Sequence, residues 1–133
     1  MQALVPAASK GRRGAGIALS ALTVSFLLFD GVIKLLDLEP VAESFARLGY
    51  PAGFALGIGL LELACVVLYV IPRTAVLGAI LLTGFLGGAT ATHVRIGDPL
   101  LTHTLFSSYV GLFLWAGLFL REARLGDLVP LRR

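Results

Sequence analysis

The sequence predicts an all-α integral membrane protein that folds as a four-helix bundle. Of its 133 residues, 57% are hydrophobic and 14% are charged, whereas soluble domains carry about 25% charged residues. A soluble domain of this size needs more polar surface to cover itself. The composition therefore excludes a disordered chain, a coiled coil and a nucleic-acid-binding domain. The single cysteine excludes an intrachain disulfide and a cysteine-rich metal site.

Four stretches are apolar over the length of about 20 residues that a transmembrane helix needs. They cover residues 15–36, 52–71, 74–94 and 100–120. The first stretch is too long for a secretory signal, contains Asp30 and has no cleavage site after it. The predicted domains are an N-terminal cytoplasmic tail, a membrane domain and a C-terminal cytoplasmic tail, over residues 1–14, 15–121 and 122–133.

Prolines and glycines mark the connections between these stretches. Pro40 ends the first helix. The turns at Pro72-Arg73 and Gly97-Asp98-Pro99 are so short that the helices they join must be antiparallel neighbours. The longer connection, residues 37–51, has room for a short amphipathic helix on the membrane surface. The apolar face of this helix would comprise Val41, Phe45 and Leu48.

The basic residues divide unequally between the two sides of the predicted bundle. One side carries Lys10, Arg12, Arg13, Arg73, Arg121, Arg124, Arg132 and Arg133, and the other carries Arg47 and Arg95. Because basic residues stay on the cytoplasmic side, both termini are expected in the cytoplasm of a multi-pass protein of the cell membrane. The net charge of +3 is then explained by basic residues on the cytoplasmic side of the membrane, and no nucleic-acid partner is needed to explain it.

Small residues allow helices to approach one another closely in lipid. Gly53 and Gly57 are spaced as a small-xxx-small pair, and so are Gly84 and Gly88. We expect these pairs at helix interfaces. The alternative is that glycine is simply common in membrane helices.

Five ionisable residues interrupt the apolar stretches. They are Asp30, Lys34, Glu62, His93 and His103. A charge at the bilayer centre costs about 2.5–3.5 kcal/mol, so such residues usually face the bundle interior, find a partner and mark a functional site. With a rise of about 1.5 Å per residue, all five fall in the half of the bilayer away from the termini. They are expected to form a cup with Glu62 at its floor.

Each of these residues also has a structural explanation. Asp30 and Lys34 are four residues apart on one helix and could simply neutralise each other. His93 could be an interfacial polar residue at a helix end. Glu62 has no partner on its own helix and lies deepest, which favours a functional role over structural hydrogen bonding. Neighbouring positions on the same helix faces complete the predicted substrate-binding set, which is His103, Thr90, Ser107, Tyr69 and Arg95.

A metal or haem site is a weaker alternative. His93, His103 and Glu62 could meet as a ligand set, but no HExxH-like spacing supports it. Two histidines joined by a tight turn are poorly placed to ligate haem from opposite sides. The sequence contains no phosphate-binding loop and no nucleophile elbow. We therefore predict no metal ion and no cofactor.

Short motifs follow one another in a recognisable order. They read FLLFDGVIKLL, FARLGYP, LGIGLLELACVVLYVIPR and GGATATHVRIGDP. Over roughly residues 20–121 this order resembles the DoxX-like membrane proteins, which are small four-helix proteins. On this resemblance Lys34, Glu62 and His93 occupy positions of the family pattern. Asp30 stands where a serine is commoner, and His103 lies outside the pattern.

Two functions are compatible with these features. The first is an enzyme whose Glu62, Asp30, His93 and Lys34 transform a lipophilic molecule by isomerisation, hydration, or opening or closure of an epoxide or another ring. The alternative is a non-catalytic subunit of a membrane oxidoreductase that binds quinone or lipid, since some DoxX-like relatives are linked to quinone-dependent sulfur oxidation. Proton-coupled transport is less expected, because four helices make a thin wall. Expected partners are membrane lipid, a lipophilic molecule or quinone and, as an open alternative, a second copy of the chain.

Overall fold

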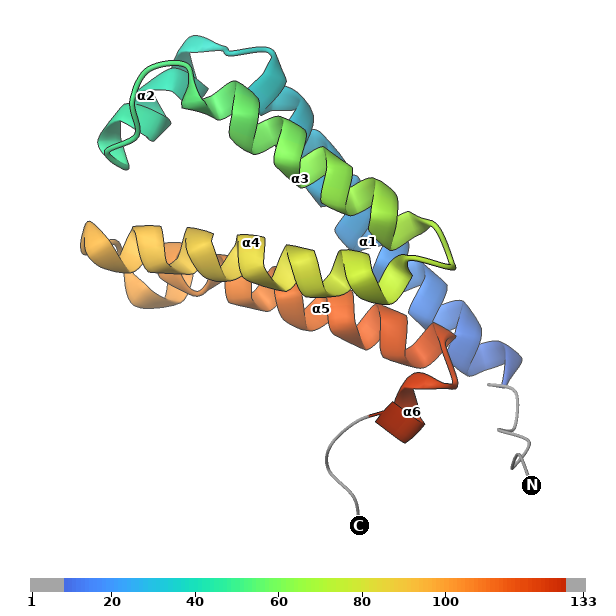
Figure 1. Ribbon diagram of the computed structural model, residues 1–133. Helices are drawn as coiled ribbons and strands as arrows, with labels where there is room; N and C mark the ends of the chain where they lie inside the picture. Colours follow the sequence, from blue (N-terminus) through green and yellow to red (C-terminus); the bar gives the residue numbers. More distant parts are fainter. Residues whose placement is uncertain (1–8, 129–133) are drawn as a thin grey trace.

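The computed structural model describes residues 9–128, and every regular element in that range is helical (Figure 1). The long helices are α1 (Lys10–Leu35), α3 (Phe54–Val70), α4 (Ala75–Arg95) and α5 (Phe106–Arg121). The short ones are α2 (Glu39–Arg47), α6 (Leu125–Leu128) and a π-helical segment, η1 (Leu100–Thr104), that leads into α5. The all-α prediction is confirmed for this range. Residues 1–8 and 129–133 of the predicted tails lie outside it.

Three helical segments are long and apolar enough to cross a membrane, namely Lys10–Leu35, Ala75–Arg95 and Leu100–Arg121. The helix predicted over residues 52–71 is shorter than expected. It has 17 residues, or about 25 Å of helix, because Gly53 takes a left-handed backbone conformation with φ of 86° and the helix begins after it. The first helix is longer than expected, since the Ser9 hydroxyl accepts a hydrogen bond from the Arg12 amide and caps α1 ahead of Lys10.

The four long helices form a ring in which α1 and α4 each contact both α3 and α5. The tight turn after α3 makes α3 and α4 neighbours, as predicted. Figure 1 shows that the pair α1/α3 and the pair α4/α5 lie close together near the termini and separate toward α2. We refer to the half with Gly16, Tyr69 and Gly78 as the closed half. The half with Lys34, His93 and α2 is the open half.

The closed half is packed through glycines. A Cβ atom on Gly78 would lie 2.3 Å from the Tyr69 backbone nitrogen, and one on Gly117 would lie 2.6 Å from the Ser20 hydroxyl. Tyr69 is fully buried between these helices. Its hydroxyl donates to the Leu114 carbonyl at 2.7 Å and lies 3.1 Å from the Ser20 hydroxyl. Close backbone approach and the hydrogen bonds of Tyr69 therefore hold this half together. The buried Nε atom of Arg121, which lies beside Tyr69, has no hydrogen-bond partner among the described residues.

The glycine pairs predicted from spacing do not make these contacts. A Cβ atom added at Gly53, Gly57, Gly84 or Gly88 would meet no atom within 4 Å. The prediction that they form helix interfaces within this chain is wrong, because the spacing does not say which face of a helix turns toward a neighbour. Gly84 and Gly88 instead lie along a cavity in the open half.

The short helix predicted between the first two spans is confirmed as α2. Pro40 occupies its first turn, where the missing amide hydrogen costs nothing. Val41 and Phe45 are partly buried on its apolar face, and Leu48 follows as the C-terminal cap. Figure 1 shows α2 at the open end of the bundle.

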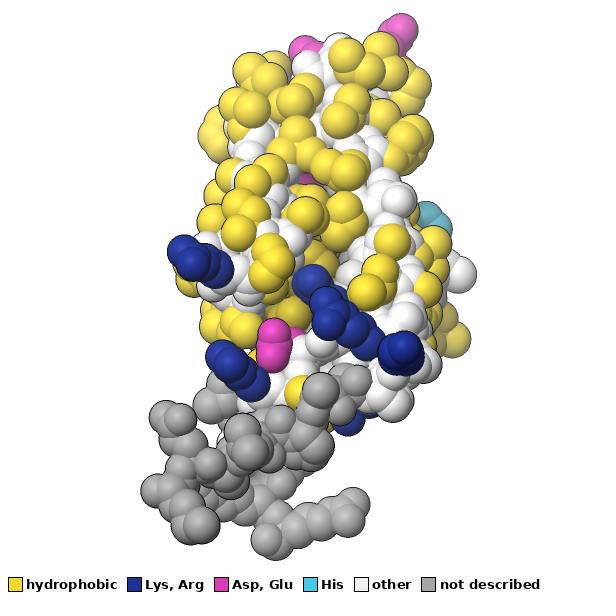
Figure 2. Space-filling model, turned by 90° about the vertical axis from the view of Figure 1, so that its right-hand side faces the viewer, with side chains coloured by type: hydrophobic (Ala, Val, Ile, Leu, Met, Phe, Trp, Pro, Cys, Tyr) yellow, Lys and Arg dark blue, Asp and Glu magenta, His cyan; other side chains and the backbone are white. Residues whose placement is uncertain are grey.

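Apolar side chains cover much of the outer surface. Figure 2 shows them over most of one face, with lysine and arginine side chains gathered toward the end where the termini lie. Leu22, Phe29 and Leu112 are each 65–68% exposed. Large apolar surfaces of this kind are unusual on a monomeric soluble protein and agree with a membrane environment.

Candidate functional site

A cavity of about 490 Å³ lies in the open half, between α1, α2, α3, α4 and α5. Its volume is within the range of pockets that bind small organic ligands. The aromatic part of its wall consists of Phe26, Phe45, Tyr50, Phe85 and Phe106. Charged and polar side chains interrupt this wall at a few points, as is common in small-molecule sites.

A cluster of three charged side chains lies where α1 and α3 pack most closely. A Cβ atom on Gly59 would lie 2.8 Å from the Lys34 Cβ atom, so Lys34 is pressed against α3 one turn before Glu62. The Lys34 Nζ donates to Glu62 Oε2 at 2.7 Å and to Asp30 Oδ2 at 2.5 Å. The expected contact between Asp30 and Lys34 is confirmed. The contact between Lys34 and Glu62 was not expected from the sequence.

Exposure falls steadily across this cluster. The side chains of Asp30, Lys34 and Glu62 are 33%, 12% and 0% exposed. Asp30 and Lys34 line the cavity, whereas Glu62 does not. Glu62 is therefore not the floor of the cup, because Lys34 lies between it and the cavity. Its second oxygen, Oε1, is buried without a hydrogen-bond partner in the described part of the chain.

Lys34 is the group that joins Glu62 to the cavity. An ammonium group has three donors, and Asp30 and Glu62 occupy two of them. The Nζ atom also lies 5.3 Å from the ring centre of Phe85, another cavity residue. With all three groups ionised, the cluster has one net negative charge in an apolar setting. Such an arrangement has the groups needed to hold a proton or to pass one on.

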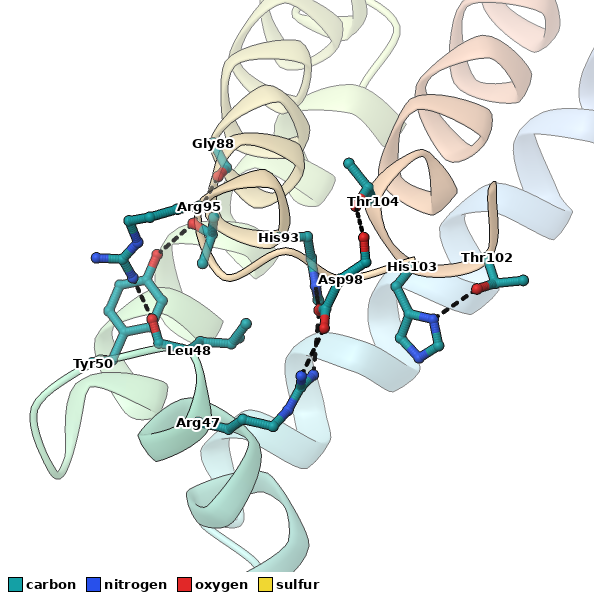
Figure 3. Close-up of polar contacts among 11 residues, drawn as sticks. Arg47, Leu48, Tyr50, Gly88, His93, Arg95, Asp98, Thr102, His103 and Thr104 are labelled. Carbon is teal, nitrogen blue, oxygen red and sulfur yellow. Dashed lines mark hydrogen bonds and ion pairs between the residues drawn. The ribbon is translucent and has the colours of Figure 1, made fainter. Parts of the chain in front are cut away.

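A second polar group reaches the cavity from the last turn of α4. His93 lines the cavity, and its Nδ1 forms a hydrogen bond with Asp98 Oδ2 (Figure 3). Gly97, with φ of 73°, reverses the chain so that Asp98 faces back toward His93. Arg47 of α2 donates to the same carboxylate, from Nη1 to Oδ1 at 2.8 Å and from Nη2 to Oδ2 at 3.4 Å. The Arg47 guanidinium and His93 together lower the pKa of Asp98 to about 2.

Two further contacts attach the region of α2 to the end of α4. Arg95 donates to the Leu48 carbonyl, and the Tyr50 hydroxyl lies 3.2 Å from the Thr92 hydroxyl (Figure 3). Thr92 also donates to the Gly88 carbonyl at 2.8 Å, which fixes its orientation. These contacts hold α2 against the rim of the cavity.

The predicted substrate-binding residues fall in different places. Ser107 lines the cavity, whereas His103, Thr90, Tyr69 and Arg95 do not. His103 is exposed and lies 2.8 Å from the Thr102 hydroxyl, away from the cavity lining. Thr90 donates to the Leu86 carbonyl at 3.1 Å.

Tyr69 and Arg95 were predicted to bind substrate, but both lie outside the cavity lining. Tyr69 shares the buried face of α3 with Glu62 but belongs to the closed half, where packing and its own hydrogen bonds account for it. Arg95 supports α2 through the Leu48 carbonyl. Sequence reasoning did not place Arg47 and Asp98 at the site. It used Arg47 only for the distribution of basic residues and Asp98 only as part of a turn. The signal for Asp98 is its position just after the turn that ends the helix of His93.

The histidines do not gather into a metal site. Within residues 9–128 no group of three His, Cys, Asp or Glu side chains is close enough to hold a metal ion. Among the groups considered from the sequence, Glu62 is enclosed behind Lys34 and His103 lies outside the cavity lining.

The apolar helices and the cavity between them define a small helical membrane protein. The chain belongs to the DoxX-like family, whose sequence pattern matches residues 18–117. No curated protein and no solved structure matches it significantly. The matched range includes every residue that lines the cavity.

Proposed function

We propose that this protein is an intramembrane acid–base enzyme that binds a lipophilic small molecule in its cavity and transfers protons to and from it. The observation that carries the proposal is the pairing of two polar groups on one apolar wall. Lys34, bound to two carboxylates, and His93, bound to a third, both line the same cavity. An apolar binding site alone would not need either group.

The lining indicates the chemical class of the ligand. Four phenylalanines and Tyr50 surround a space of about 490 Å³, which suits a compact hydrocarbon skeleton better than a long polar molecule. Asp30, Lys34 and His93 would bind one or two oxygen atoms on that skeleton. A lipophilic molecule with a hydroxyl, carbonyl or epoxide group meets both conditions.

The reactions proposed for this site involve no net oxidation or reduction of the substrate. In an isomerisation, a base removes one proton and an acid returns one at another atom, so no oxidant is required. The His93 imidazole would act as the base or acid on the α4 side. The Lys34 ammonium would stabilise a developing negative oxygen on the α1 side. Hydration and ring opening use the same two groups, with water or a substrate oxygen as the nucleophile.

Glu62 has an indirect role in this proposal. The cavity does not reach it, so we do not assign it direct contact with the ligand. It would hold Lys34 in place and exchange protons with the cavity through the Lys34 ammonium, to which it lies at 2.7 Å. Asp30, which is 33% exposed and lines the cavity, would be the carboxylate that meets the ligand.

The proposal also includes the arrangement in the membrane. We propose that α3 completes a set of four spans and that both termini face the cytoplasm. Arg12, Arg13, Arg73 and Arg124 are exposed. Figure 2 shows lysine and arginine side chains gathered toward one end of the bundle, in agreement with the excess of basic residues on cytoplasmic sides. The cavity would then open in the outer half of the membrane.

Turnover can be tested before the substrate is known. Lipophilic compounds would be extracted from cells that express the wild-type protein, His93→Gln, Lys34→Met or His103→Gln, and compared by untargeted mass spectrometry. We expect one pair of compounds, equal in mass or differing by one water, to interconvert with the wild type and with His103→Gln. His93→Gln and Lys34→Met should lose this conversion. His103→Gln is the matched control because His103 lies outside the cavity lining.

Two results would contradict the enzyme proposal. One is conversion by His93→Gln and Lys34→Met at the wild-type level. The other is a lipid or quinone that co-purifies equally with wild type and His93→Gln, without conversion by either. That second result would favour the accessory subunit of a membrane oxidoreductase.

A further inference from the structure

We infer that Asp98 is a positioning residue for His93, and that Arg47 makes this positioning depend on the seating of α2. The inference rests on the proposed function, because it concerns the histidine on the cavity wall. The residues involved come from three elements and meet at the rim of the cavity (Figure 3).

The hydrogen bond to Asp98 determines which nitrogen of His93 carries the proton. An ionised carboxylate can only accept hydrogen bonds, so Nδ1 must donate. The neutral imidazole is thereby held as the Nδ1–H tautomer, with a lone pair on Nε2. In the described part of the chain Nε2 has no hydrogen-bond partner. Because the side chain is 23% exposed and lines the cavity, Nε2 is the nitrogen available to a ligand.

Asp98 is itself fixed from several directions. Both of its oxygens accept from Arg47, and Oδ2 also meets His93. A guanidinium that binds both oxygens fixes the plane of a carboxylate as well as its position. The Thr104 hydroxyl of η1 donates to the Asp98 carbonyl at 3.1 Å, which holds the backbone. The Asp98 side chain is 8% exposed, so it has little freedom to turn away.

Arg47 connects this arrangement to α2. The structure packs α2 against α3, and Arg47, Phe45 and Leu48 from the α2 region also line the cavity. One contact, from Arg47 to Asp98, therefore both seats α2 at the rim and fixes the carboxylate that orients His93. A displacement of α2 from the rim would therefore open the cavity and release the fixed tautomer of His93 at the same time.

The tautomer can be measured without knowing the substrate. The chain has two histidines, so the His103→Gln background leaves His93 as the single imidazole. The full chain, labelled with ¹⁵N-histidine and placed in lipid nanodiscs, would be studied by ¹H–¹⁵N long-range correlation spectra at about pH 8, where an ordinary imidazole is neutral. We expect the pattern of the Nδ1–H tautomer with an unprotonated Nε2.

Variants at Asp98 test the cause. Asp98→Ala should lose the Nδ1–H pattern and give the tautomer mixture of free histidine. Asp98→Asn retains the shape of the side chain and should shift the ratio as well, since an amide can also donate. Asp37→Asn is the matched control, because it removes an exposed carboxylate at the same end of the bundle. A dominant Nε2–H tautomer with Asp98 present, or an unchanged spectrum in both Asp98 variants, would overturn the inference.

Arg47→Met tests the dependence on α2. We expect a smaller shift in the same direction, with weaker hydrogen-exchange protection of the α2 amides. An unchanged tautomer in a variant with a released α2 would show that Arg47 does not take part. Arg73→Met, in the turn between α3 and α4, is the control and should change neither the tautomer of His93 nor the protection of the α2 amides.

Turnover separates this inference from the proposed function. Once the substrate pair is identified, Asp98→Ala should lower kcat by about 10- to 100-fold, as when the partner behind a metal-bound histidine is lost, with little change in KM. If the tautomer depends on Asp98 but His93→Gln retains full turnover, the positioning stands and the proposed function fails. If the tautomer is independent of Asp98, the positioning fails whatever the turnover.

Discussion

The two halves of the bundle are built from the same helices and differ in how closely the pair α1/α3 meets the pair α4/α5. In the closed half, Gly78 lets α4 approach the backbone of Tyr69. The buried Tyr69 hydroxyl donates a hydrogen bond to the Leu114 carbonyl and lies within hydrogen-bond distance of the Ser20 hydroxyl. In the open half the helix pairs separate around a cavity of about 490 Å³. There Glu62 is fully buried, and one of its carboxylate oxygens has no hydrogen-bond partner within residues 9–128.

This contrast indicates that the closed half stabilises the folded protein, whereas features of the open half lower its stability. Helices in lipid associate through close packing and interhelical hydrogen bonds. The closed half supplies both around Tyr69, although the buried Arg121 Nε there has no hydrogen-bond partner among the described residues. A cavity and buried charges each cost stability. The open half combines these costs, so packing in the closed half has to compensate for them. Features that cost stability and persist are expected at functional sites.

The largest effect is expected from removing the cation of the open half. Lys34→Met leaves Glu62 buried beside Asp30 without a countercharge, and we expect a loss of about 3–5 kcal/mol, as when one partner of a buried ion pair is removed. Unfolding in mixed micelles by SDS titration would measure it. Lys10→Met is the control, because Lys10 is exposed.

The double variant Lys34→Met/Glu62→Leu sharpens this test. If the buried charge of Glu62 causes the loss, removing it should restore part of the stability. A double variant that is less stable than Lys34→Met would contradict the role given to the ion pair in the open half.

The second effect compares two glycines of one helix. Gly78→Ala forces a Cβ atom against the Tyr69 backbone, and overpacking of this kind costs about 1–3 kcal/mol. Gly84→Ala meets no atom within 4 Å and should be neutral or stabilising by about 0.5–1 kcal/mol, since alanine favours helix. The same unfolding assay applies. Equal effects at both positions would remove the distinction between the halves.

A smaller effect is expected at the hydroxyl of the closed half. Tyr69→Phe removes the hydrogen bond to the Leu114 carbonyl and should cost about 0.5–1.5 kcal/mol. Tyr109→Phe is the matched control, because the Tyr109 hydroxyl donates to the Leu101 carbonyl at an exposed position. Thermal unfolding should separate the two variants, and a Tyr69→Phe protein as stable as Tyr109→Phe would argue against the hydrogen bond.

The smallest effect is a pH dependence at the rim of the open half. Arg47 and His93 lower the pKa of Asp98 from 3.8 to about 2. A lowered carboxyl pKa stabilises the folded state at pH values above the unfolded pKa, and this stabilisation is lost as the pH falls toward the folded value. The protection of the α2 amides against hydrogen exchange, expressed relative to the intrinsic exchange rate at each pH, should therefore fall between about pH 4 and pH 2. Arg47→Met should show faster exchange already at neutral pH and a weaker dependence.

Local patterns in the sequence were sufficient for much of the fold. Apolar stretches bounded by proline and glycine predicted the long helices, and the spacing of Val41 and Phe45 predicted α2. The four-residue spacing of Asp30 and Lys34 predicted their contact. Each of these features depends on neighbours along one helix, which the sequence determines directly.

Contacts between helices were not predictable in the same way. Depths counted from Cα positions placed Lys34 well above Glu62, but a long side chain and the close packing at Gly59 bring the two together. The spacing of Gly84 and Gly88 does not reveal which face meets a neighbour. Asp98 was recognised only as part of a turn, because the geometry that returns its side chain to His93 depends on the backbone of Gly97.

Occupancy of the cavity is the most direct test of the account. Non-protein mass bound after gentle extraction would be measured by native mass spectrometry for the wild type, Gly88→Phe and Gly87→Phe. Gly88 lines the cavity and has open space beside it, whereas its neighbour Gly87 has open space and does not line the cavity. The account predicts that the wild type and Gly87→Phe retain a lipophilic molecule that a folded Gly88→Phe protein has lost. The same bound mass in all three proteins would contradict it.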